Sequence, residues 1–399
     1  RETHGLDLVV AHFDHGIHPD SEGVAAGVQA LAARYRLGCE VGRGLLGRAA
    51  GETAARAARY AWLERTRLSL GAELIFTAHQ ADDQAETVLM RALAGSGPAG
   101  LAAISNRRGV MIRPLLSFHR SEILAYLRSE GLEAWTDPAN TDPRHLRAWV
   151  RGEVLPALRR RLTGVDGALL RLGRQAARDR RAWQEAVELL PGLDFRLEHD
   201  GFSVAAGVLS GYDSALAETV LLAAARRAGC RLGPRRAARA LALASRAVSG
   251  TSVPLGEAWS AEIAFGRLVV SRDESAGTTA AWPLLGAAGE GRWGRWRLRW
   301  SSQAAPPRQS RAGLVAWFAP VPLVVRGWAA GERIRPLGGN GRRRLVRCFQ
   351  DARIPRSRRG GWPVVAGPDG LVWVPGVSRS ETALPAPGME AVRVDAEYA

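Results

Sequence analysis

Short apolar runs alternate with helical patterns through the first 150 residues, and this alternation constrains the fold more than any other feature of the chain. Strands are expected over 6–11, 38–42, 73–78 and 110–116, and helices over 22–35, 52–70, 82–94 and 120–130. Strands and helices that alternate in this way build a parallel sheet covered on both faces. Ligands of such sheets lie at the carboxyl ends of the strands. We therefore predict an α/β fold with a Rossmann-like sheet in a catalytic domain over 1–150.

The alternation of strands and helices ends near residue 150. The chain has 399 residues, which is enough for several domains. Residues 151–200 are helical and basic, which predicts a basic helical linker, with a merely solvated helix as the open alternative. Residues 201–275 combine Ala-rich helices with short strands and predict a small mixed α/β domain. Residues 303–311 are typical of a linker. Residues 313–390 predict a small α+β C-terminal domain.

Three tryptophans, Trp293, Trp296 and Trp300, alternate with arginines just before that expected linker. On a strand, Trp296 and Trp300 share one face and Trp293 takes the other. Such a face could stack on nucleic-acid bases. Aromatic residues on a half-buried strand are more often core, and we favour that interpretation.

The chain carries a formal charge of +16, and all 55 of its basic side chains are arginine. GC-biased coding would explain arginine in place of lysine, but not the excess over 39 acidic residues. A net positive charge of this size indicates a polyanionic partner, and guanidinium groups suit phosphate. The longest nearly uncharged stretch, 312–325, is shorter than the ~20 residues that cross a bilayer. We expect no membrane association.

The three cysteines, Cys39, Cys230 and Cys348, lie far apart in the sequence and form no Cys-x-x-Cys pair. This pattern indicates neither a disulfide framework nor a zinc ribbon. A reducing, cytoplasmic environment is expected.

The third predicted strand runs into a polar cluster that contains His79, Asp82, Asp83 and Glu86. Three carboxylates at the start of a helix could hold a hydrated Mg²⁺ together with a triphosphate. Capping of the helix N-terminus would explain one aspartate, but not the whole cluster. We predict that the three acids are catalytic and that Asp83 binds the metal.

Other polar residues follow the expected strands. The loop after the acidic helix contains Gly95 and Gly97, whose N–H groups could approach anionic oxygens. His12, His15 and His18 follow the first strand, but a strand would place His12 and His15 on opposite faces, so zinc is not favoured.

The segment between 113 and 151 adds a second group of candidates. Arg113 precedes a predicted helix. Asp137 and Asn140 could form a simple Asx turn. The spaced arginines Arg147 and Arg151 that follow suggest a helix that faces phosphate.

A series of motifs runs through the chain in this order: HFDHG, GETAARAARYAWL, TAHQADDQAETVLMR, GSGPAGLAAI, IRPLL, and TDPANTD followed by LRAWVRGEVLPAL. The run GERIRPLGGNGRRRLVRCFQDARIPRSRRGGWPVVAGPDGLVWVPGVSRSE comes near the C-terminus. Together these motifs resemble the bacterial tRNA(Ile)-lysidine synthetases of the PP-loop superfamily. The likeness covers most of the chain and implies a PP-loop ATPase type of sheet. It also implies that the mixed domain over 201–275 binds substrate and that the C-terminal domain over 313–390 binds tRNA.

The resemblance implies an activity in two steps. ATP adenylates the wobble cytidine of an isoleucine tRNA, and the amine of free lysine then displaces AMP. Adenylation converts a poor leaving group into a phosphate, and Mg²⁺ spreads the charge of the departing pyrophosphate. ATP and Mg²⁺ are the implied cofactors, and tRNA(Ile) and lysine the implied partners. The sequence leaves open whether the chain forms a homodimer.

The candidate site residues are then catalytic Asp82, Asp83, Glu86 and Arg113, nucleotide-binding His12, His79, Arg91, Gly95 and Gly97, and substrate-binding Asp137, Asn140, Arg147, Arg151, Arg342, Arg343 and Arg344.

The sequence also departs from the family pattern. The phosphate loop Ser-Gly-Gly-x-Asp-Ser that follows the family's first strand does not occur, and its expected position lies upstream of Arg1. Ala94 stands where a basic residue usually precedes the Gly-Ser-Gly loop, so we expect Arg91, one turn earlier, to reach the phosphates. Ala148 stands where the family has Asn.

Two alternatives stay open at this point. One is another PP-loop tRNA-modifying enzyme, such as a cytidine thiolase, although paired cysteines are lacking. The other is a non-catalytic tRNA-binding fragment that keeps the fold without the phosphate loop.

In such a sheet the first strand lies between the strands expected at 6–11 and 73–78. We therefore predict that these two strands do not pair, and that residues 1–399 alone neither bind ATP appreciably nor form lysidine. Calorimetry with Mg-ATP tests the second expectation. Micromolar binding, with turnover in the presence of tRNA and lysine, would show that other residues build the phosphate site.

Overall fold

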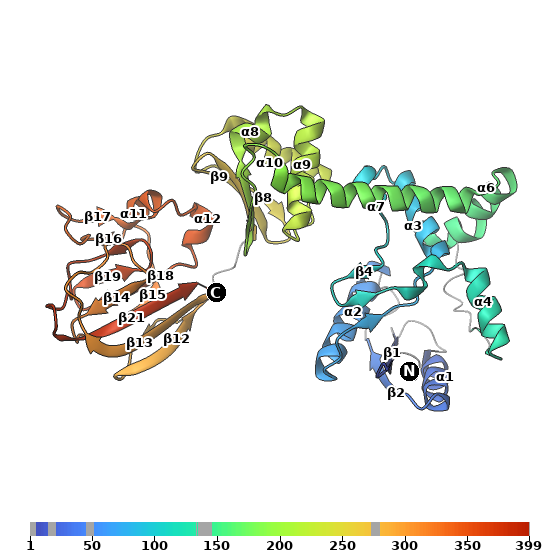
Figure 1. Ribbon diagram of the computed structural model, residues 1–399, viewed down its shortest axis with the longest axis horizontal. Coiled ribbons are helices and arrows are strands. Elements are labelled where there is room, and N and C mark those ends of the chain that lie inside the picture. Colours follow the sequence, from blue (N-terminus) through green and yellow to red (C-terminus); the bar gives the residue numbers. More distant parts are fainter. Residues whose placement is uncertain are drawn as a thin grey trace. The chain divides into compact units, whose positions relative to one another are not determined.

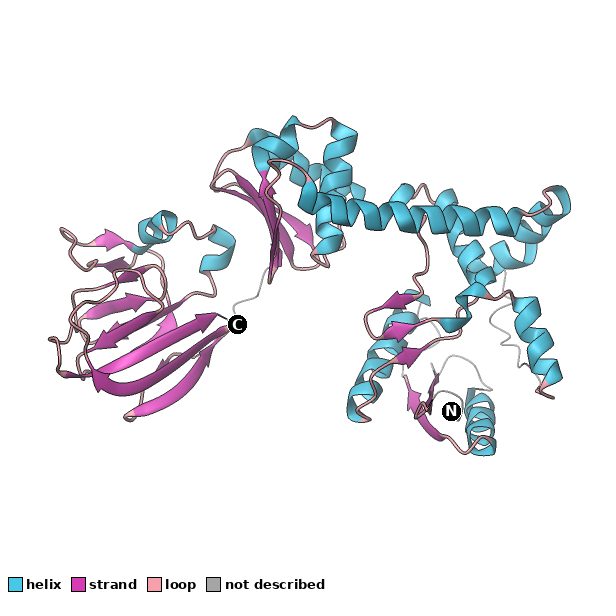
Figure 2. Cartoon of the chain, in the orientation of Figure 1, coloured by secondary structure: helices cyan, strands magenta, loops and turns pink. Residues whose placement is uncertain are grey.

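The computed structural model describes residues 5–14, 21–44, 52–132, 134, 146–272 and 280–398 (Figure 1). Its contacts divide the chain into two compact units, Arg1–Arg180 and Arg181–Ala399. Helices and short strands alternate in the first unit, and the end of the second unit consists mostly of strands (Figure 2). The finer domain ranges expected from the sequence stay predictions. Within the described ranges, no helix is both long and apolar enough to span a membrane.

The first unit has the predicted α/β architecture. Its elements are β1 (Val9–Asp14), α1 (Ser21–Arg34), β2 (Gly38–Arg43), α2 (Glu52–Ser69), β3 (Ile75–Phe76), α3 (Ala81–Leu93), β4 (Arg107–Arg108), β5 (Met111–Ile112) and α4 (Arg120–Ser129). Strands β1 and β2 are parallel, as are β3 and β5. Helix α2 packs closely on β2, because a Cβ at Gly42 would lie 2.2 Å from the Trp62 ring.

The parallel strands form separate sheets. Among the described residues, β1 pairs with β2 alone, and β3 pairs with β5 alone. The prediction that β1 and β3 do not pair is therefore confirmed. A cavity of about 1340 Å³ is lined by residues of both strands and of α2.

Two predicted strands are shorter than expected. The segment 73–78 contributes only β3, and the segment 110–116 contributes only β5. Pro114 begins a 3-10 helix over Pro114–Ser117. Proline has no N–H to donate to a neighbouring strand, which explains why β5 ends before it.

The basic segment after residue 145 is helical, as predicted. It comprises α5 (Leu146–Trp149), a π-helical turn (Val150–Val154), α6 (Leu155–Arg161) and α7 (Val165–Leu189). Helix α7 approaches α3 where it carries Gly173, since a Cβ there would lie 2.9 Å from Cγ2 of Val88. This close contact fixes α3 against the basic helices of the first unit.

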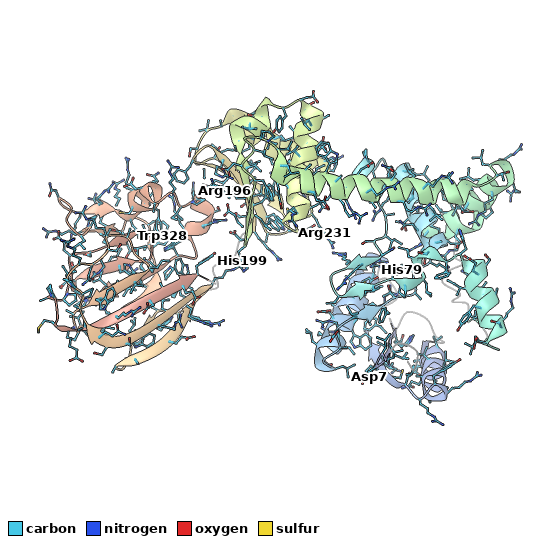
Figure 3. The ribbon with its side chains drawn as sticks, viewed as in Figure 1. Asp7, His79, Arg196, His199, Arg231 and Trp328 are labelled. Atoms are coloured by element: carbon cyan, nitrogen blue, oxygen red, sulfur yellow. The ribbon has the colours of Figure 1, made fainter. Side chains whose placement is uncertain are left out.

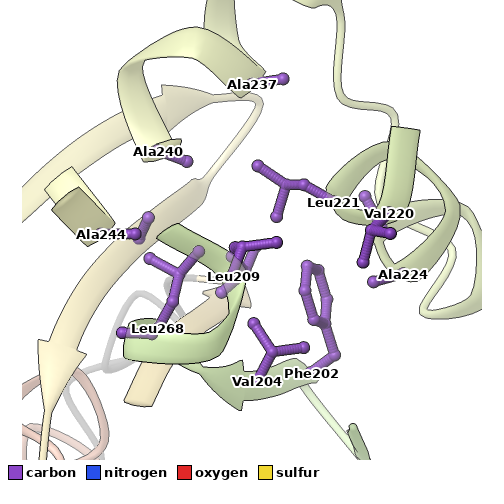
Figure 4. Packing of buried hydrophobic residues seen from close by; sticks show 14 of the residues in the cluster. Phe202, Val204, Leu209, Val220, Leu221, Ala224, Ala237, Ala240, Ala244 and Leu268 are labelled. Carbon is purple, nitrogen blue, oxygen red and sulfur yellow. The ribbon is translucent and has the colours of Figure 1, made fainter. Parts of the chain in front are cut away.

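The second unit begins with a five-stranded sheet in the order β6-β7-β10-β9-β8. The strands are β6 (Arg196–Glu198), β7 (Gly201–Ala205), β8 (Ser252–Gly256), β9 (Trp259–Ala264) and β10 (Arg267–Arg272), and the helices are α8 (Ala206–Gly211), α9 (Ser214–Arg227) and α10 (Pro234–Arg246). Phe202, Leu209 and Leu268 are fully buried among the alanines of α9 and α10 (Figure 4). The small side chains let these helices pack tightly against the sheet.

The rest of the second unit consists of strands β11 to β21 with two short helices. Their bounds are β11 (Trp282–Pro283), β12 (Ala288–Trp293), β13 (Trp296–Ala304), β14 (Val315–Phe318), β15 (Val324–Gly327), β16 (Arg333–Ile334), β17 (Arg343–Arg344), α11 (Leu345–Asp351), α12 (Arg356–Arg359), β18 (Pro363–Gly367), β19 (Gly370–Val374), β20 (Ser378–Arg379) and β21 (Glu390–Tyr398). The main sheets have the orders β11-β15-β18-β19-β20 and β12-β13-β21-β14.

The linker prediction for 303–311 is wrong at its start. Gln303 and Ala304 belong to β13, which pairs along its whole length with β21. The hairpin of β12 and β13 is thus part of the same sheet as the C-terminal strand. Local composition could not reveal a partner strand almost 90 residues further along the chain.

The three tryptophans are core, as favoured from the sequence. Trp293, Trp296 and Trp300 are 8%, 3% and 9% exposed. Trp293 does not continue the strand of the other two, because a turn intervenes and places it opposite Trp296 on β12. Buried rings of this kind stabilise the sheet and leave no face for base stacking.

The close packing at position 289 leaves room only for glycine. Gly289 lies directly opposite Trp300, and a Cβ at Gly289 would be 2.3 Å from the indole ring. The ring is held in place because its Nε1 donates to the carbonyl of Leu285 at 3.1 Å. The strand therefore has room for a hydrogen at this position and nothing larger.

We expect Gly289→Ala to lower the free energy of unfolding by about 1–3 kcal/mol, because the methyl group must displace the Trp300 ring. Urea unfolding followed by tryptophan fluorescence measures this. Gly360→Ala is the matched control, since a Cβ at Gly360 would have no atom within 4 Å. Equal stability of the two variants would contradict the packing described here.

Candidate active site

The acidic cluster lies at the start of α3, just after the carboxyl end of β3. The backbone N–H of Gln80 donates to Oδ2 of Asp83 at 3.0 Å. Asp83 thus helps to fix the beginning of the helix, as the capping interpretation required. Its other carboxylate oxygen remains available for further partners.

Asp83 and Glu86 form a network with two arginines. Arg147 Nε lies 2.9 Å from Oε2 of Glu86, and its Nη2 lies 3.1 Å from Oδ1 of Asp83. Arg151 Nε lies 2.6 Å from Oε1 of Glu86, and its Nη2 lies 3.3 Å from Oδ1 of Asp83. Glu86 is only 2% exposed. Two carboxylates and two guanidinium groups therefore balance one another at the edge of the cavity.

Asp82 points to different partners. Its Oδ2 accepts the backbone N–H of Arg120 at 2.8 Å, and its Oδ1 lies 3.6 Å from Nη2 of Arg159. Nδ1 of His119 is 3.6 Å from Oδ2. Asp82 therefore joins α3 to the start of α4, away from the network of Asp83 and Glu86.

This geometry does not provide a resident metal site. The three carboxylates do not converge, and each of them is already paired with an arginine. No group of three or more His, Cys, Asp or Glu side chains in the described ranges is placed to hold a metal ion. Mg²⁺ keeps several waters and readily binds through phosphates, so an ion that enters with a nucleotide needs fewer protein ligands.

His79 lines the cavity beside Asp83 and is marked in Figure 3. Its Nδ1 is 3.0 Å from the hydroxyl of Thr77. Burial lowers the pKa of His79 to about 4; nearby Asp83 opposes this shift, and nearby arginines add to it. The imidazole is therefore neutral near pH 7 and can both donate and accept a hydrogen bond.

Arg113 is buried, with 6% of its surface exposed. Its Nη1 donates to the carbonyl of Ser105 at 2.7 Å, and its Nη2 lies 3.0 Å from Sδ of Met111. Its buried Nε has no hydrogen-bond partner. These contacts place the predicted catalytic guanidinium beneath the site, where it supports the loop before β5.

The Gly-Ser-Gly loop is closed by Arg91. Nη1 of Arg91 donates to the carbonyl of Gly100 at 2.6 Å. Gly95 adopts a φ of +69°, a left-handed conformation that glycine takes without strain. Burial, and then the charge of Arg180, lower the pKa of Arg91. The structure therefore gives Arg91 a role in holding the loop that contains Gly97.

Of the predicted site residues in the described ranges, His79, Asp83, Arg147 and Arg151 line the cavity. His12 lies on β1, and Arg342, Arg343 and Arg344 belong to the second unit. Asp137 and Asn140, like His15 and His18, lie outside the described residues.

Sequence reasoning missed two arginines of α2. Arg56 and Arg59 line the cavity together with His79 and Asp83. Their guanidinium groups lie 5.1 Å and 5.3 Å from the centre of the Tyr60 ring. The spacing of three residues on a helix already placed them on one face. Only the packing of α2 showed that this face meets the cavity.

We expect Glu86→Gln to lower the free energy of unfolding by about 2–4 kcal/mol, because it leaves two partly buried guanidinium groups without their carboxylate. Urea denaturation monitored by circular dichroism measures the change. Glu64→Gln is the control, since the Glu64 carboxylate also pairs with an arginine, Arg67, but its side chain is 45% exposed. Equal effects of the two changes would mean that the buried network contributes nothing to stability.

Comparisons with known proteins agree with this architecture. Residues 1–158 match a family described as a PP-loop domain, and residues 323–396 match the TilS substrate C-terminal domain. The tRNA(Ile)-lysidine synthase of Symbiobacterium thermophilum is 34% identical, with 98% of this chain and 88% of that protein covered. The tRNA(Ile)-lysidine synthase of Geobacter sulfurreducens is 31% identical, and the match covers 98% of this chain and 87% of that protein.

Among solved structures, a TilS C-terminal domain is 25% identical in sequence to this chain, with a TM-score of 0.26. The match covers 30% of this chain and 98% of that structure's chain. The similarity to the two synthases extends over nearly the whole chain and includes both matched domains. The chain therefore belongs to the tRNA(Ile)-lysidine synthase family.

Proposed function

We propose that this protein ligates lysine to the wobble cytidine of an isoleucine tRNA, at the expense of ATP, and so forms lysidine. The observation that carries this proposal is the similarity to tRNA(Ile)-lysidine synthases over 98% of the chain. The reaction proceeds through an adenylated cytidine, from which the amine of lysine displaces AMP as a new C–N bond forms. A cytoplasmic location follows from a tRNA substrate.

The network on α3 suits an amino acid as substrate. Asp83, at the cavity wall, offers carboxylate oxygens to an ammonium group, and Arg147 and Arg151 offer guanidinium groups to a carboxylate. A carboxylate has about four lone-pair sites, so Asp83 can accept from an ammonium while it stays bonded to arginine. Glu86 is buried and holds the two arginines in place. Free lysine carries both of the complementary groups. We assign lysine binding to this network.

The end of the adjoining cavity beside His79 and Asp83 suits the nucleotide, because the part between residues 6–11 and 73–78 is where the family's first strand is expected. Arg56 and Arg59 add positive charge to its wall, which compensates in part for Ala94 in the Gly-Ser-Gly segment. The neutral imidazole of His79 can hydrogen-bond to a polar group there without adding charge. Asp83 would be the residue nearest to a Mg²⁺ ion bound with ATP, and such an ion would neutralise charge on the phosphates.

Binding of tRNA draws on the basic surfaces outside this cavity. Nine arginines lie between residues 151 and 181, and eight lie between 341 and 360. Such surfaces neutralise phosphates and make affinity dependent on salt. The cytidine-thiolase alternative is not favoured, because the family shown is that of the lysidine synthases and the chain lacks paired cysteines.

Asp83→Asn tests the assignment in a form of the protein that carries the family's phosphate loop. We expect lysidine formation to fall at least about a hundredfold, as for loss of an electrostatic group in an active site, while tRNA affinity stays within about twofold. Single-turnover release of AMP and filter binding of tRNA measure the two quantities.

Asp166→Asn is the matched control, because Asp166 also pairs with an arginine, Arg159, at 2.8 Å but outside the cavity lining. It should retain activity. Near-normal AMP release by Asp83→Asn would exclude the proposed role of Asp83, and absence of lysidine in the unaltered protein would exclude the function itself.

A further inference from the structure

Two parts of the second unit meet through charged groups. The β6–β10 part is the five-stranded sheet with its helices, and the β11–β21 part holds the remaining sheets with α11 and α12. The hydrophobic cluster of the β6–β10 part lies within 183–270, and the two clusters of the β11–β21 part lie within 282–396. Among the described residues, no cluster of buried hydrophobic side chains therefore joins the two parts.

Glu262, on β9, binds the first turn of α12. Its Oε1 accepts the backbone N–H of Arg356 at 2.9 Å, and its Oε2 accepts that of Ser357 at 2.9 Å. Glu262 is only 3% exposed. A carboxylate at the start of a helix is stabilised by the free N–H groups there. Glu262 thus caps a helix of the other part, more than 90 residues further along the chain.

The hairpin of β6 and β7 supplies the second contact. Nη2 of Arg358, on α12, lies 2.8 Å from Oδ1 of Asp200 and also contacts the carboxylate of Glu198. Asp200 is only 10% exposed at its side chain. His199, marked in Figure 3, contacts Arg295 between β12 and β13 through its Nδ1. Three consecutive residues of one hairpin therefore bind arginines of the β11–β21 part.

Each side of this contact is held in place within its own part. The hydroxyl of Ser203 donates to Oε1 of Glu198 at 2.7 Å. On the other side, Nη2 of Arg359 donates to the carbonyl of Ile354 at 2.8 Å, and the indole of Trp328 donates to the carbonyl of Arg359. These bonds do not cross between the parts, so both surfaces keep their shape when the parts separate.

The closed contact leaves one polar group unsatisfied. Nε of Arg358 is buried and has no hydrogen-bond partner. A buried donor without a partner is costly, and water would satisfy it in an open state. Parts of one chain that meet through a polar interface are expected to move relative to one another, unlike parts that share a large hydrophobic one.

We propose that Glu198, Asp200 and Glu262 form an ionic latch between the two parts, and that this latch opens reversibly. When it is closed, the three acids hold the basic helix α12 and fix the β11–β21 part in one orientation on the β6–β10 part. When it is open, the acids and Arg358 are hydrated, and each part moves as a rigid body. The latch therefore decides whether the second unit behaves as one body or as two.

The test measures a distance between the two parts in the full chain by pulsed electron paramagnetic resonance. Spin labels are attached through Ala242→Cys on α10 and Ala304→Cys on β13, because both positions are exposed. Cys39→Ser removes a half-buried thiol, and the other two cysteines are buried. The measurement needs no substrate, so its outcome does not depend on the proposed function.

The latch variant carries Glu198→Gln, Asp200→Asn and Glu262→Gln. These changes remove the carboxylates opposite Arg358. They also place an amide N–H group against a backbone N–H group of α12, where two donors cannot bond to each other.

The control variant loses the same three charges from acids that bind arginines of their own part. Its changes are Glu188→Gln, Asp194→Asn and Glu257→Gln, and the arginines are Arg227, Arg196 and Arg236. The two variants therefore differ in the latch and not in net charge.

We expect a single narrow distance distribution in the unaltered protein and in the control variant. The distribution of the latch variant should be at least about twice as broad, because parts without the polar contacts move independently. Hydrogen exchange at the amides of Arg356 and Ser357 should accelerate at least about tenfold in the latch variant alone, since these amides lose their acceptor.

A narrow distribution in the latch variant would overturn the proposal even if the two amides exchange faster, because α12 alone would then fray. Equal broadening in the latch and control variants would overturn it as well, since net charge would be the cause. A broad distribution in the unaltered protein would show that the contact does not hold the parts together. Circular dichroism identifies a latch variant that fails to fold, and Arg358→Gln, which opens the latch from the other side, then replaces it with the same two measurements.

Discussion

The buried carboxylate of Glu86 is the constraint on which the first unit depends. A carboxylate that is 2% exposed is costly unless its charge is matched and its oxygens are hydrogen-bonded. Arg147 and Arg151 satisfy both conditions and in doing so attach the segment after residue 145 to α3. Arg151 belongs to the π-helical turn Val150–Val154. Such turns occur frequently at functional sites.

Helix α3 is also held in place by contacts that are not ion pairs. Gly173 lets α7 approach Val88, and the side chain of Gln84 accepts the N–H of Ile104 at 2.8 Å. Arg91 closes the following loop on Gly100. Helix α3 is therefore fixed along its length, which keeps Asp83 and His79 at the wall of the cavity.

The second unit is stabilised differently, because its C-terminal sheets have few long helices to pack against them. Its C-terminal part buries Trp296, Trp373 and Phe318 between strands. Arg379 is fully buried in the same part and donates to the carbonyls of Val372 and Trp317. Burial lowers the pKa of Arg379 to about 10, and the carbonyl oxygens provide the hydrogen bonds that its charge requires.

The sequence by itself determined the features that depend on residues close together in the chain, namely the helices and the ends of the strands. The periodicity of apolar side chains predicted α1, α2, α3 and α4 to within two residues. The polar cluster after β3 pointed to the place where the site is now proposed. These features are local, because helices and strand ends are set by side chains a few positions apart.

Only the tertiary structure decided which distant residues meet. Arg147 and Arg151 were expected to face phosphate, but they lie against acids more than 60 residues earlier in the chain. Arg56 and Arg59 reached the cavity wall through the packing of α2, and Trp293 met Trp296 across a turn. Such pairings depend on how helices and strands pack, and a residue's sequence neighbours do not encode the partner that packing brings to it.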